Sequence, residues 1–368
     1  MFLQNLSIIN FKNYTEASLE FSSKINCFAG MNASGKTNLL DAIYYLSFCK
    51  SFSNPIDSQN IHHNFDFFVI QGKYKLNGNT DELHCGVKRN QNKVFKRNKK
   101  VYERLSDHIG QYPLVLVYPG DVNLLLGGSE ERRKFVDGVI SQYNKEYLHL
   151  LLQYKRALLQ RNTLLKGFAE KKYFDESSLE VWDEQLIEYG NYLYEQRKLF
   201  FEDFLPVFSE YYSFLTHSEE KVNIEYVSHL NEDSFQSLLQ RARQNDTYAQ
   251  FTTKGIHKDN LEFIINDYPV KKFGSQGQQK SFIIALKLAQ FAFTKKVKGK
   301  KPIMLFDDIF DKLDEHRVTQ LMKLVSDNTF GQIFVTDTDS ERLKNIFSTI
   351  ETETKIFEVE NGKVKETE

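Results

Sequence analysis

The chain has 368 residues, of which 41% are hydrophobic and 26% are charged, as is typical of a globular protein of two or three domains. A formal net charge of −1 argues weakly against a nucleic-acid-binding protein, because such proteins usually carry an excess of basic residues. Local basic patches are still compatible with this charge. Three scattered cysteines do not make a disulfide framework, and no apolar run is long enough to span a membrane. The N-terminal residues lack the basic and apolar segments of a signal peptide, so we expect a cytoplasmic protein.

The first 118 residues are expected to form strands and turns with one helix. Apolar runs at residues 6–9, 24–29, 67–74 and 83–87 predict strands. Residues 38–43 follow the second run after a glycine-rich turn and predict the helix.

The zone from residue 129 to residue 215 predicts two long antiparallel helices. Ser129, followed by two acidic residues, is typical of a helix N-terminus with the serine as N-cap. Apolar and aromatic residues recur at helical spacing from Phe135 to Thr163, and again across residues 178–204. We expect these helices to pack together as a compact arm.

The last zone returns to strands and helices. Apolar runs predict strands at residues 222–226, 261–265, 303–306 and 333–335. Helical patterns lie between them, at about residues 276–295 and 315–327.

The octapeptide GMNASGKT, residues 30–37, fits the phosphate-binding pattern G-x-x-x-x-G-K-[ST]. A strand precedes it and a helix follows, so loop amides and the helix N-terminus would point at phosphate oxygens. Lys36 would reach the β- and γ-phosphates, and the Thr37 hydroxyl would ligate Mg²⁺. A glycine-rich turn with an unrelated lysine is the structural alternative. The predicted ATP contacts are Gly30, Met31, Asn32, Ala33, Ser34, Gly35, Lys36, Thr37 and Asn38.

A second acidic site is expected where the apolar run 302–306 ends in Asp307 and Asp308. Asp307 would hold Mg²⁺ directly or through water, and Asp308 would orient or deprotonate the attacking water. On its own such a pair is often only the end of a strand. Its partnership with the P-loop makes it informative, because it implies a sheet assembled from both ends of the chain.

A third motif, SQGQQK at residues 275–280, opens the helix predicted from Ser281 to Lys295. Ser275 and Gly277 at a helix start could form another anion site, although a capped helix with a flexible turn explains the same letters. The order of this motif, Asp307-Asp308, Leu313-Asp314 and Thr336 matches an ABC-type ATPase. We therefore predict an α/β fold in which residues 1–118 and 216–368 form an ABC-type P-loop ATPase head and residues 119–215 an inserted helical arm.

Together these motifs resemble the RecF family of the ABC/SMC ATPase class over essentially the whole chain. An arginine-rich part, with RRK at 132–134 and QRN at 160–162, is the most RecF-like, since other ABC heads lack it. The further residues that carry the resemblance are Asn10-Phe11-Lys12-Asn13-Tyr14, GMNASGKTNLLDAIY, Lys50-Ser51-Phe52, Tyr118-Pro119-Gly120-Asp121 and Gly255-Ile256-His257-Lys258-Asp259.

The chain departs from the family pattern at several positions. Lys12 replaces the usual arginine, and Ser53 stands where a basic residue is common. Within the P-loop, Met31 and Ala33 replace a glutamate and a glycine, which leaves the amide cradle intact. Ile256 stands where proline is expected.

The resemblance implies an ATP-induced homodimer, with Ser275 and Gly277 of one copy acting on ATP held by the other. Hydrolysis would serve as a release switch, slow alone and faster with DNA. The implied partners are double-stranded and gapped DNA, and RecR and RecO mediators with RecA downstream. The implied location is the cytoplasm, in association with the nucleoid. The implied catalytic residues are Asp308, Lys36, Ser275 and Gly277.

Two basic stretches are candidate DNA contacts, with a solvated hairpin or loop as the alternative for each. We expect Arg132 and Arg133 to pair with neighbouring acids instead, and His257 to be structural. The candidate DNA residues are Lys96, Arg97, Lys99, Lys100, Lys295 and Lys296, beside Lys88, Arg89, Lys93, Lys298, Lys300 and Lys301.

Other function classes are compatible with parts of this pattern. A nucleotide-gated protein scaffold would share the ATP motifs but would bind DNA weakly. A structural SMC-like organiser needs a far longer heptad coil than residues 129–215 provide. A fused nuclease would need an extra metal-binding domain, for which no residues remain.

Overall fold

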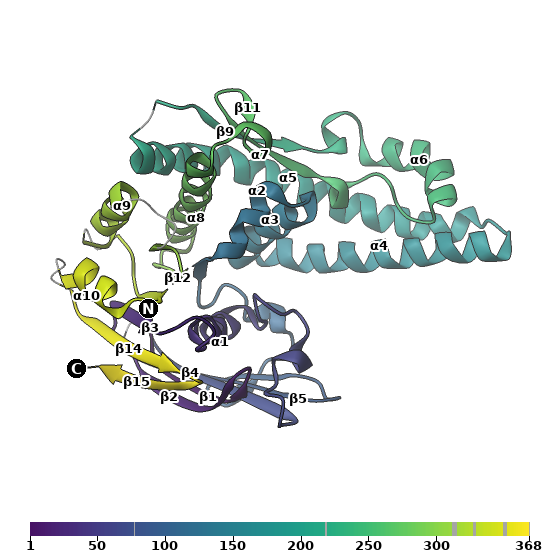
Figure 1. Ribbon diagram of the computed structural model, residues 1–368. Coiled ribbons are helices and arrows are strands. Elements are labelled where there is room, and N and C mark those ends of the chain that lie inside the picture. The colour runs from purple at the N-terminus through teal and green to yellow at the C-terminus, as the bar shows by residue number, and fades with distance from the viewer. Residues whose placement is uncertain (77, 218, 311–314, 327–328, 349–351, 368) are drawn as a thin grey trace. The chain divides into compact units, whose positions relative to one another are not determined.

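The computed structural model describes residues 1–76, 78–217, 219–310, 315–326, 329–348 and 352–367. The chain divides into two compact units (Figure 1). The first unit comprises Met1–Asp121, Phe214–His217 and Lys280–Glu368, and the second comprises Val122–Ser213 and Ser218–Gln279. The expected Leu313-Asp314 motif lies outside the described residues.

The first unit contains an antiparallel sheet of order β2-β1-β4-β5-β6-β7. Its strands alternate buried and outward-facing residues, as Leu6 and Ile8 against Ser7 and Ile9 illustrate in β1. This alternation gives the sheet one core face and one outer face. The strands are β1 (Phe2–Phe11), β2 (Tyr14–Glu20), β4 (Phe67–Leu76), β5 (Asn79–Lys88), β6 (Val94–Arg97) and β7 (Lys100–Val101).

The same unit contains a second sheet, of order β15-β14-β3-β13-β12-β8, in which all neighbours except β14 and β15 run parallel. Strands β3, β12 and β13 are buried at every residue, which explains their continuous apolar sequences. The strands are β3 (Ile25–Ala29), β8 (Leu114–Val117), β12 (Ile303–Asp307), β13 (Ile333–Asp337), β14 (Thr354–Glu360) and β15 (Lys363–Thr367). Since β3 pairs with β13 and β14, this sheet is assembled from both ends of the chain, which confirms the predicted fold class.

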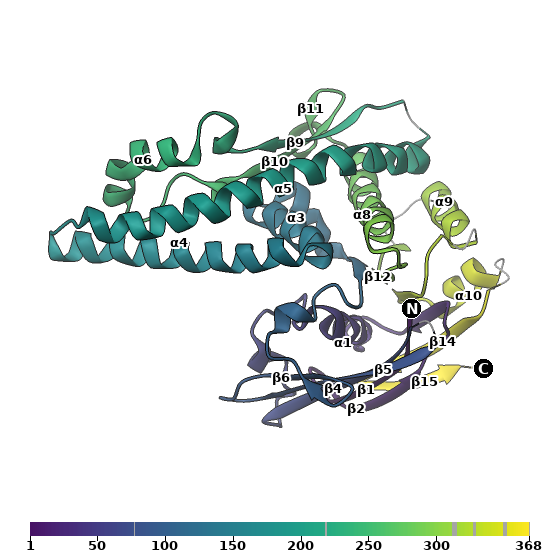
Figure 2. The same cartoon turned by 180° about the vertical axis from the view of Figure 1, so that it is seen from behind.

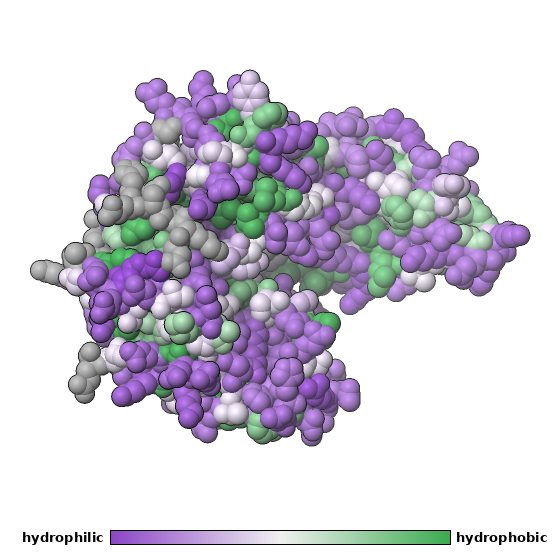
Figure 3. Space-filling view, viewed as in Figure 1, coloured by the Kyte–Doolittle hydropathy of each residue, from purple (hydrophilic) through white to green (hydrophobic). Residues whose placement is uncertain are grey.

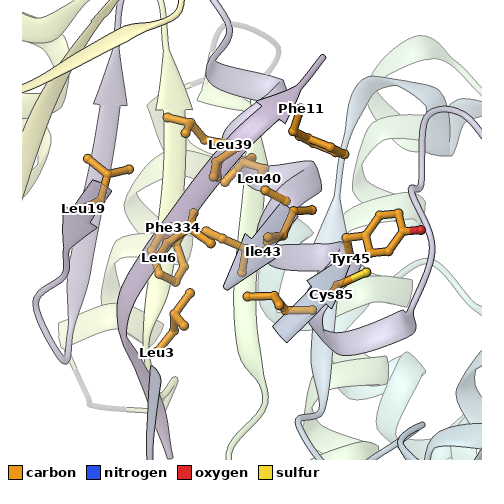
Figure 4. Packing of buried hydrophobic residues seen from close by; sticks show 14 of the residues in the cluster. Leu3, Leu6, Phe11, Leu19, Leu39, Leu40, Ile43, Tyr45, Cys85 and Phe334 are labelled. Carbon is orange, nitrogen blue, oxygen red and sulfur yellow. The ribbon is translucent and has the colours of Figure 1, made fainter. Parts of the chain in front are cut away.

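Helix α1 (Lys36–Phe48) contacts strands of both sheets and supplies the centre of the core. Leu39, Leu40 and Ile43 from α1 meet Leu6 of β1 and Phe334 of β13 in one buried cluster (Figure 4). Burial of such side chains stabilises the fold by about 1.5–3 kcal/mol each. The helix that carries the P-loop lysine is therefore held on two sides. This unit also contains the part of α8 (Gln276–Lys298) from Lys280 on, α9 (Glu315–Ser326), α10 (Ser340–Ser348) and the last residues of α5 (Glu176–Thr216).

The second unit consists of helices with a small antiparallel sheet of order β11-β10-β9 (Figure 2). The strands are β9 (Val222–Val227), β10 (Asn260–Ile265) and β11 (Tyr268–Pro269). The helices are α2 (Val122–Leu126), α3 (Ser129–Tyr143), α4 (Lys145–Lys171), α5 (Glu176–Thr216), α6 (Phe235–Ala249) and α7 (Val270–Phe273).

The helical zone differs from its prediction in three details. The first long helix is interrupted at Asn144, whose side chain accepts a hydrogen bond from the amide of Tyr147 and so caps α4. Helix α3 has Gly128 rather than Ser129 at its N-cap. The second long helix continues through Pro206 to Thr216, beyond the predicted end at residue 204.

The boundaries of the units also differ from those expected. Residues 219–279, which we expected in the ATPase domain, belong to the second unit. Buried Arg197 of α5 explains this, because its Nη1 lies 2.6 Å from Asp259 Oδ2 and its Nη2 lies 2.9 Å from Asp137 Oδ1. Arg133 of α3 also donates to the Asp259 carbonyl at 2.7 Å. These bonds tie β10 to the helical arm.

A second buried ion network explains the QRN residues of the arm. Arg161 is fully buried and donates to Asp183 at 2.5 Å and to Asp246 at 2.7 Å. Its neighbour Asn162 accepts hydrogen bonds from the amide and hydroxyl of Thr252, each at 2.8 Å. These family-typical residues therefore hold α4, α5 and α6 together.

Hydrophilic side chains cover most of the face seen in Figure 3. Among the described residues, no helix combines the length and the apolar composition needed to cross a bilayer. The three cysteines are buried thiols.

Candidate functional site

The P-loop connects β3 to α1 in the arrangement that the sequence predicts. Gly35 precedes the first residue of α1 with a φ of 120°, a conformation that favours glycine. A Cβ added at Gly30 would lie 2.2 Å from the Val359 carbonyl oxygen, so this glycine permits close packing against β14. The loop therefore sits at the carboxyl end of the parallel strands, where α/β proteins bind ligands.

Lys36 lies across the P-loop, and its side chain is buried. Its ammonium group donates to the Gly30 carbonyl at 2.6 Å and to the Met31 carbonyl at 3.0 Å. These two carbonyls hold the positive charge next to the loop amides. A phosphate bound there would meet both the ammonium and the N-terminus of α1.

Asp307 at the end of β12 meets the P-loop threonine directly. The Thr37 hydroxyl lies 2.9 Å from Oδ1 and 3.1 Å from Oδ2 of this carboxylate. Thr336 of β13 donates a further hydrogen bond to Oδ1 at 2.8 Å. Burial raises the pKa of Asp307, and the bonds from Thr336 and Thr37 partly oppose that rise.

The adjacent Asp308 has a positive φ of 50°, unusual for a residue with a side chain. Its amide donates to the Thr336 hydroxyl at 3.0 Å, and the same hydroxyl donates to Asp307. Thr336 thus links the two acids and fixes the backbone turn between them. The turn follows the strand end directly.

A hydroxyl and a carboxylate are ligands that suit Mg²⁺. Among the described residues, no cluster of three or more histidine, cysteine or acidic side chains could hold a metal alone. The Thr37–Asp307 pair has the chemistry of a Mg²⁺ site, since proteins usually hold this ion through one or two carboxylates together with substrate phosphates.

Ser275 caps its own helix. Its hydroxyl accepts from the Gln278 amide at 3.2 Å, and the Gln278 side chain accepts from the Ser275 amide at 2.8 Å. This reciprocal pair is a capping box, which satisfies two backbone donors at the start of α8. The interpretation of residues 275–278 as a capped helix start is therefore supported by the geometry. Gly277 lies in the first turn of the same helix.

The first basic stretch divides into paired and exposed residues. Arg97 forms a 2.9 Å ion pair with Asp81, and Lys93 forms a 2.8 Å pair with Asp57. Lys96 and Lys99 line an outer groove of about 630 Å³ on the antiparallel sheet. Lys100 is exposed.

The second basic stretch begins in the last turn of α8 and continues beyond its end. Lys295 is half-buried and Lys296 is exposed. The Lys301 ammonium donates to the Phe330 carbonyl at 3.3 Å.

Among the described residues, Arg132 and Arg133 bind carbonyls and uncharged side chains rather than the neighbouring acids that we expected. Arg132 donates to the carbonyls of Leu124 and Gly127 and to the Asn260 side chain. Arg133 donates to Ser129 Oγ at 2.8 Å and to a backbone carbonyl. These bonds connect the first turn of α3 to residues 124–127 and 259–260.

His257 lies in the second unit, between two hydrogen-bond partners. One ring nitrogen lies 2.8 Å from the Tyr154 hydroxyl and the other 2.9 Å from the Thr252 carbonyl. Burial lowers the pKa of His257 to about 4. These contacts explain a neutral histidine with a packing role.

The two unusual positions Lys12 and Ser53 are neighbours in space. Lys12 donates to the Ser53 hydroxyl at 2.6 Å and forms an ion pair with buried Asp41 of α1. Ser51 also donates to Asp41, at 2.6 Å. The two departures from the family pattern therefore complement each other around one carboxylate.

Comparison with known proteins places these features in a family. Residues 1–366 match the family of the AAA ATPase domain. The DNA replication and repair protein RecF of Phocaeicola vulgatus is 52% identical over 368 residues, which cover 100% of this chain and 98% of that protein. RecF of Flavobacterium johnsoniae is 51% identical over 357 residues, covering 97% of this chain and 99% of that protein.

Solved structures agree with the sequence matches. A structure of the recombination mediator protein RecF with ATP, in the RecFOR pathway, superposes with a TM-score of 0.90 at 29% identity and covers 100% of this chain and 98% of that chain. An Smc head domain from Pyrococcus furiosus, at 18% identity and a TM-score of 0.56, covers 100% of this chain and 96% of that chain and shares the fold. The chain therefore belongs to the RecF family and to the family of the AAA ATPase domain, and it shares its fold with Smc head domains.

Proposed function

We propose that this protein is an ATP-dependent DNA-binding protein of recombinational repair and replication-fork maintenance. The observation that carries the proposal is the contact between Thr37 of the P-loop and Asp307 of β12, beside the buried ammonium of Lys36. This is the arrangement that a P-loop ATPase uses to hold a nucleotide with its metal. Membership of the RecF family, whose named relatives are DNA replication and repair proteins, supports the DNA role.

In this proposal the P-loop residues 30–38 hold ATP, and Thr37 and Asp307 hold Mg²⁺. The metal, when bound, neutralises developing charge on the phosphates. Asp308 follows Asp307 at the strand end and orients or deprotonates the attacking water. Lys36 stabilises the β- and γ-phosphates.

Two copies associate when ATP is bound, and Ser275 and Gly277 of one copy cover the γ-phosphate held by the other. The start of α8 offers amides and a positive helix end for that phosphate, and the capping box holds its backbone in place. Loss of the γ-phosphate removes the attraction, so hydrolysis acts as a release switch. Slow turnover that DNA accelerates follows from this role.

The proposed ligands are double-stranded and gapped DNA, contacted by Lys96, Arg97, Lys99, Lys100, Lys295 and Lys296. The exposed lysines of this set suit phosphate contacts best, since Arg97 is already paired with Asp81. The proposed partners are RecR and RecO mediators, which help to place RecA on single-stranded gaps. The proposed location is the cytoplasm, in association with the nucleoid. The structural relative described as a recombination mediator of the RecFOR pathway supports this assignment.

A nucleotide-gated scaffold with little DNA affinity is the second candidate. The net charge of −1 and the engagement of Arg97 and Lys93 in ion pairs favour it. Such a protein would dimerise with ATP yet bind mainly other proteins. DNA affinity separates the two candidates.

The deciding experiment measures molecular mass by light scattering, with and without Mg-ATP and a gapped duplex, and DNA affinity across a salt series. We expect an ATP-dependent dimer whose log affinity for duplex falls against log salt with a slope of about 0.9 per phosphate contact, several in total. A flat salt response favours the scaffold. A protein that stays monomeric while saturated with Mg-ATP and duplex contradicts the dimer mechanism.

A further inference from the structure

Two distant parts of the first unit donate hydrogen bonds to the backbone of the P-loop. Asn13, in the turn between β1 and β2, donates its side-chain amide to the Ser34 carbonyl at 3.0 Å. The Gly362 amide, in the turn between β14 and β15, donates to the same carbonyl at 3.1 Å. The Tyr14 hydroxyl donates to the Gly35 carbonyl at 3.1 Å. The Gly35 carbonyl also accepts the amides of Asn38 and Leu39, at 2.9 Å and 3.2 Å, at the start of α1. The Ser34 carbonyl is thus held by donors from two distant parts of the chain, and the Gly35 carbonyl by Tyr14 together with the helix.

The donors themselves are held in place. The Asn13 side-chain oxygen accepts a 2.7 Å hydrogen bond from Asn38 in the first turn of α1, which fixes the orientation of its amide. Tyr14 is fully buried, and burial raises the pKa of its phenol well above the ordinary value, so its proton stays available for donation. Neither side chain is a mobile surface group.

Steric contacts show how closely these segments approach the loop. A Cβ at Gly35 would lie 2.6 Å from the Asn13 side-chain nitrogen and 2.7 Å from the Tyr14 hydroxyl. A Cβ at Gly362 would lie 2.5 Å from the Asn13 carbonyl oxygen, and this residue has a φ of 75°. The donors therefore occupy space that side chains at both glycines would fill.

The geometry of the peptide bond gives these contacts a consequence for phosphate binding. In a planar trans peptide, the carbonyl and the following N–H point in opposite directions. Holding the Ser34 carbonyl outward therefore directs the Gly35 N–H inward, and holding the Gly35 carbonyl directs the Lys36 N–H. Backbone N–H groups of this part of a P-loop cradle phosphate oxygens. The outer hydrogen bonds thus set the direction of the inner donors before any nucleotide arrives.

We propose that Asn13, Tyr14 and Gly362 form a clamp that preorganises the P-loop, and that the C-terminal hairpin is thereby part of the nucleotide-binding machinery. These are positioning residues, because they act on phosphate only through the backbone that they hold. The inference rests on the proposed ATP site. It adds that residues outside the P-loop contribute to the affinity for ATP.

The test measures the dissociation constant for Mg-ATP by calorimetry on the full chain, together with the melting temperature without nucleotide. Asn13→Asp keeps the acceptor for Asn38 but removes the donor to Ser34, and Asn13→Ala removes both. Tyr14→Phe removes only the hydroxyl. Asn5→Ala, on the outer face of β1, is the matched control. Lys36→Ala tests the ATP site itself.

We expect Asn13→Asp and Tyr14→Phe to weaken ATP binding by about fivefold, as for loss of one hydrogen bond of about 1 kcal/mol, and Asn13→Ala to weaken it at least as much. Gly362→Ala should also weaken binding, because its Cβ would meet the Asn13 carbonyl oxygen and so push the two turns apart. The unliganded melting temperature of Asn13→Asp and Tyr14→Phe should stay within about 2 °C of the parent, and Asn5→Ala should bind as the parent does. ATP affinity within about twofold of the parent in Asn13→Asp and Tyr14→Phe overturns the clamp. A loss of affinity that only follows a lower melting temperature overturns it equally.

The failure of the clamp and the failure of the ATP site are distinguishable. If Lys36→Ala abolishes ATP binding while the clamp variants bind normally, the clamp is wrong and the ATP site stands. If Lys36→Ala binds as the parent does, the ATP site is wrong. Should Asn13→Ala fail to fold, Asn13→Asp and Tyr14→Phe decide together, since the first keeps the acceptor for Asn38 and the second keeps the ring.

Discussion

Thr37 Oγ1 lies 2.9 Å and 3.1 Å from the two carboxylate oxygens of Asp307, although 270 positions separate these residues in the chain. The contact joins the first turn of α1 to the end of β12. Because Thr336 holds the same carboxylate from β13, the acid is oriented before a metal or nucleotide binds. This relationship leads to the first prediction.

Asp307→Asn and Asp308→Asn are expected to differ in what they lose. Asp307→Asn removes the charge beside Thr37 and should weaken Mg-dependent ATP binding by at least about tenfold. Asp308→Asn should bind ATP as the parent does, hydrolyse it about a hundredfold more slowly and accumulate dimer, since it loses only the group that handles water. Nucleotide titrations and phosphate release measure both effects. Identical behaviour of the two variants contradicts the division of roles.

Ser275→Arg tests whether the start of α8 acts on a second copy. This variant should bind ATP with unchanged affinity as a monomer and fail to dimerise, because a bulky cation replaces the small hydroxyl where the γ-phosphate of the other copy is proposed to dock. Ser275→Thr is the control, because threonine also serves as an N-cap and keeps the capping box. Light scattering with Mg-ATP gives the answer. If Ser275→Arg dimerises as the parent does, the assignment across two copies is wrong.

Arg197→Met is expected to destabilise the second unit strongly. The guanidinium holds Asp137 and Asp259, and burial already raises the pKa of Asp259. Removing the cation leaves both carboxylates without their buried partner, which costs about 3–5 kcal/mol. Arg241→Met, which breaks an exposed pair with Asp233, should cost less than about 1 kcal/mol. Thermal unfolding of the two variants compares them, and equal melting temperatures would contradict the prediction.

His108 predicts a loss of stability in mild acid. The ring is fully buried, its Nε2 lies 2.7 Å from the Leu46 carbonyl, and burial lowers its pKa to about 4. In the unfolded chain the pKa is about 6.5, so below that pH the unfolded state binds a proton that the folded state does not. The contribution of His108 to the free energy of unfolding is therefore complete above pH 6.5 and is lost as the pH falls toward 4. The loss amounts to about 2 kcal/mol at pH 5.

His108→Gln keeps a donor for Leu46 and removes the titrating ring. We expect the melting temperature of the parent to fall more steeply than that of the variant between pH 7.5 and pH 5. Parallel curves for the two proteins would show that another group governs the acid response. Comparing the two proteins at each pH separates His108 from the other buried titratable groups.

The sequence predicts the P-loop and the acidic strand end because each is a local pattern. GMNASGKT and the acids after the run 302–306 each have a fixed pattern, and the structure brings Thr37 and Asp307 together as expected. Most strands also match, since the buried runs of β3, β12 and β13 are continuous. These features depend on near neighbours in the chain.

The features that the sequence analysis missed depend on distant partners. No local pattern marks Asn13 as a donor to Ser34, or Arg197 as the tie between α5 and residue 259. The break at Asn144 has a local signal, because asparagine is a strong N-cap, but the continuous apolar spacing concealed it. The Asn361-Gly362 pair between two short β-like runs is a hairpin signal that could have predicted the last turn.

The position of β3 between β13 and β14 has a consequence for synthesis on the ribosome. The P-loop at residues 30–37 is translated well before β13 (Ile333–Asp337) and β14 (Thr354–Glu360), the two strands that flank its own strand. A nascent or prematurely terminated chain that lacks β13 and β14 therefore carries the phosphate-binding motif without the strands that pack beside it. The phosphate-binding conformation of the loop therefore requires that both β13 and β14 have been translated.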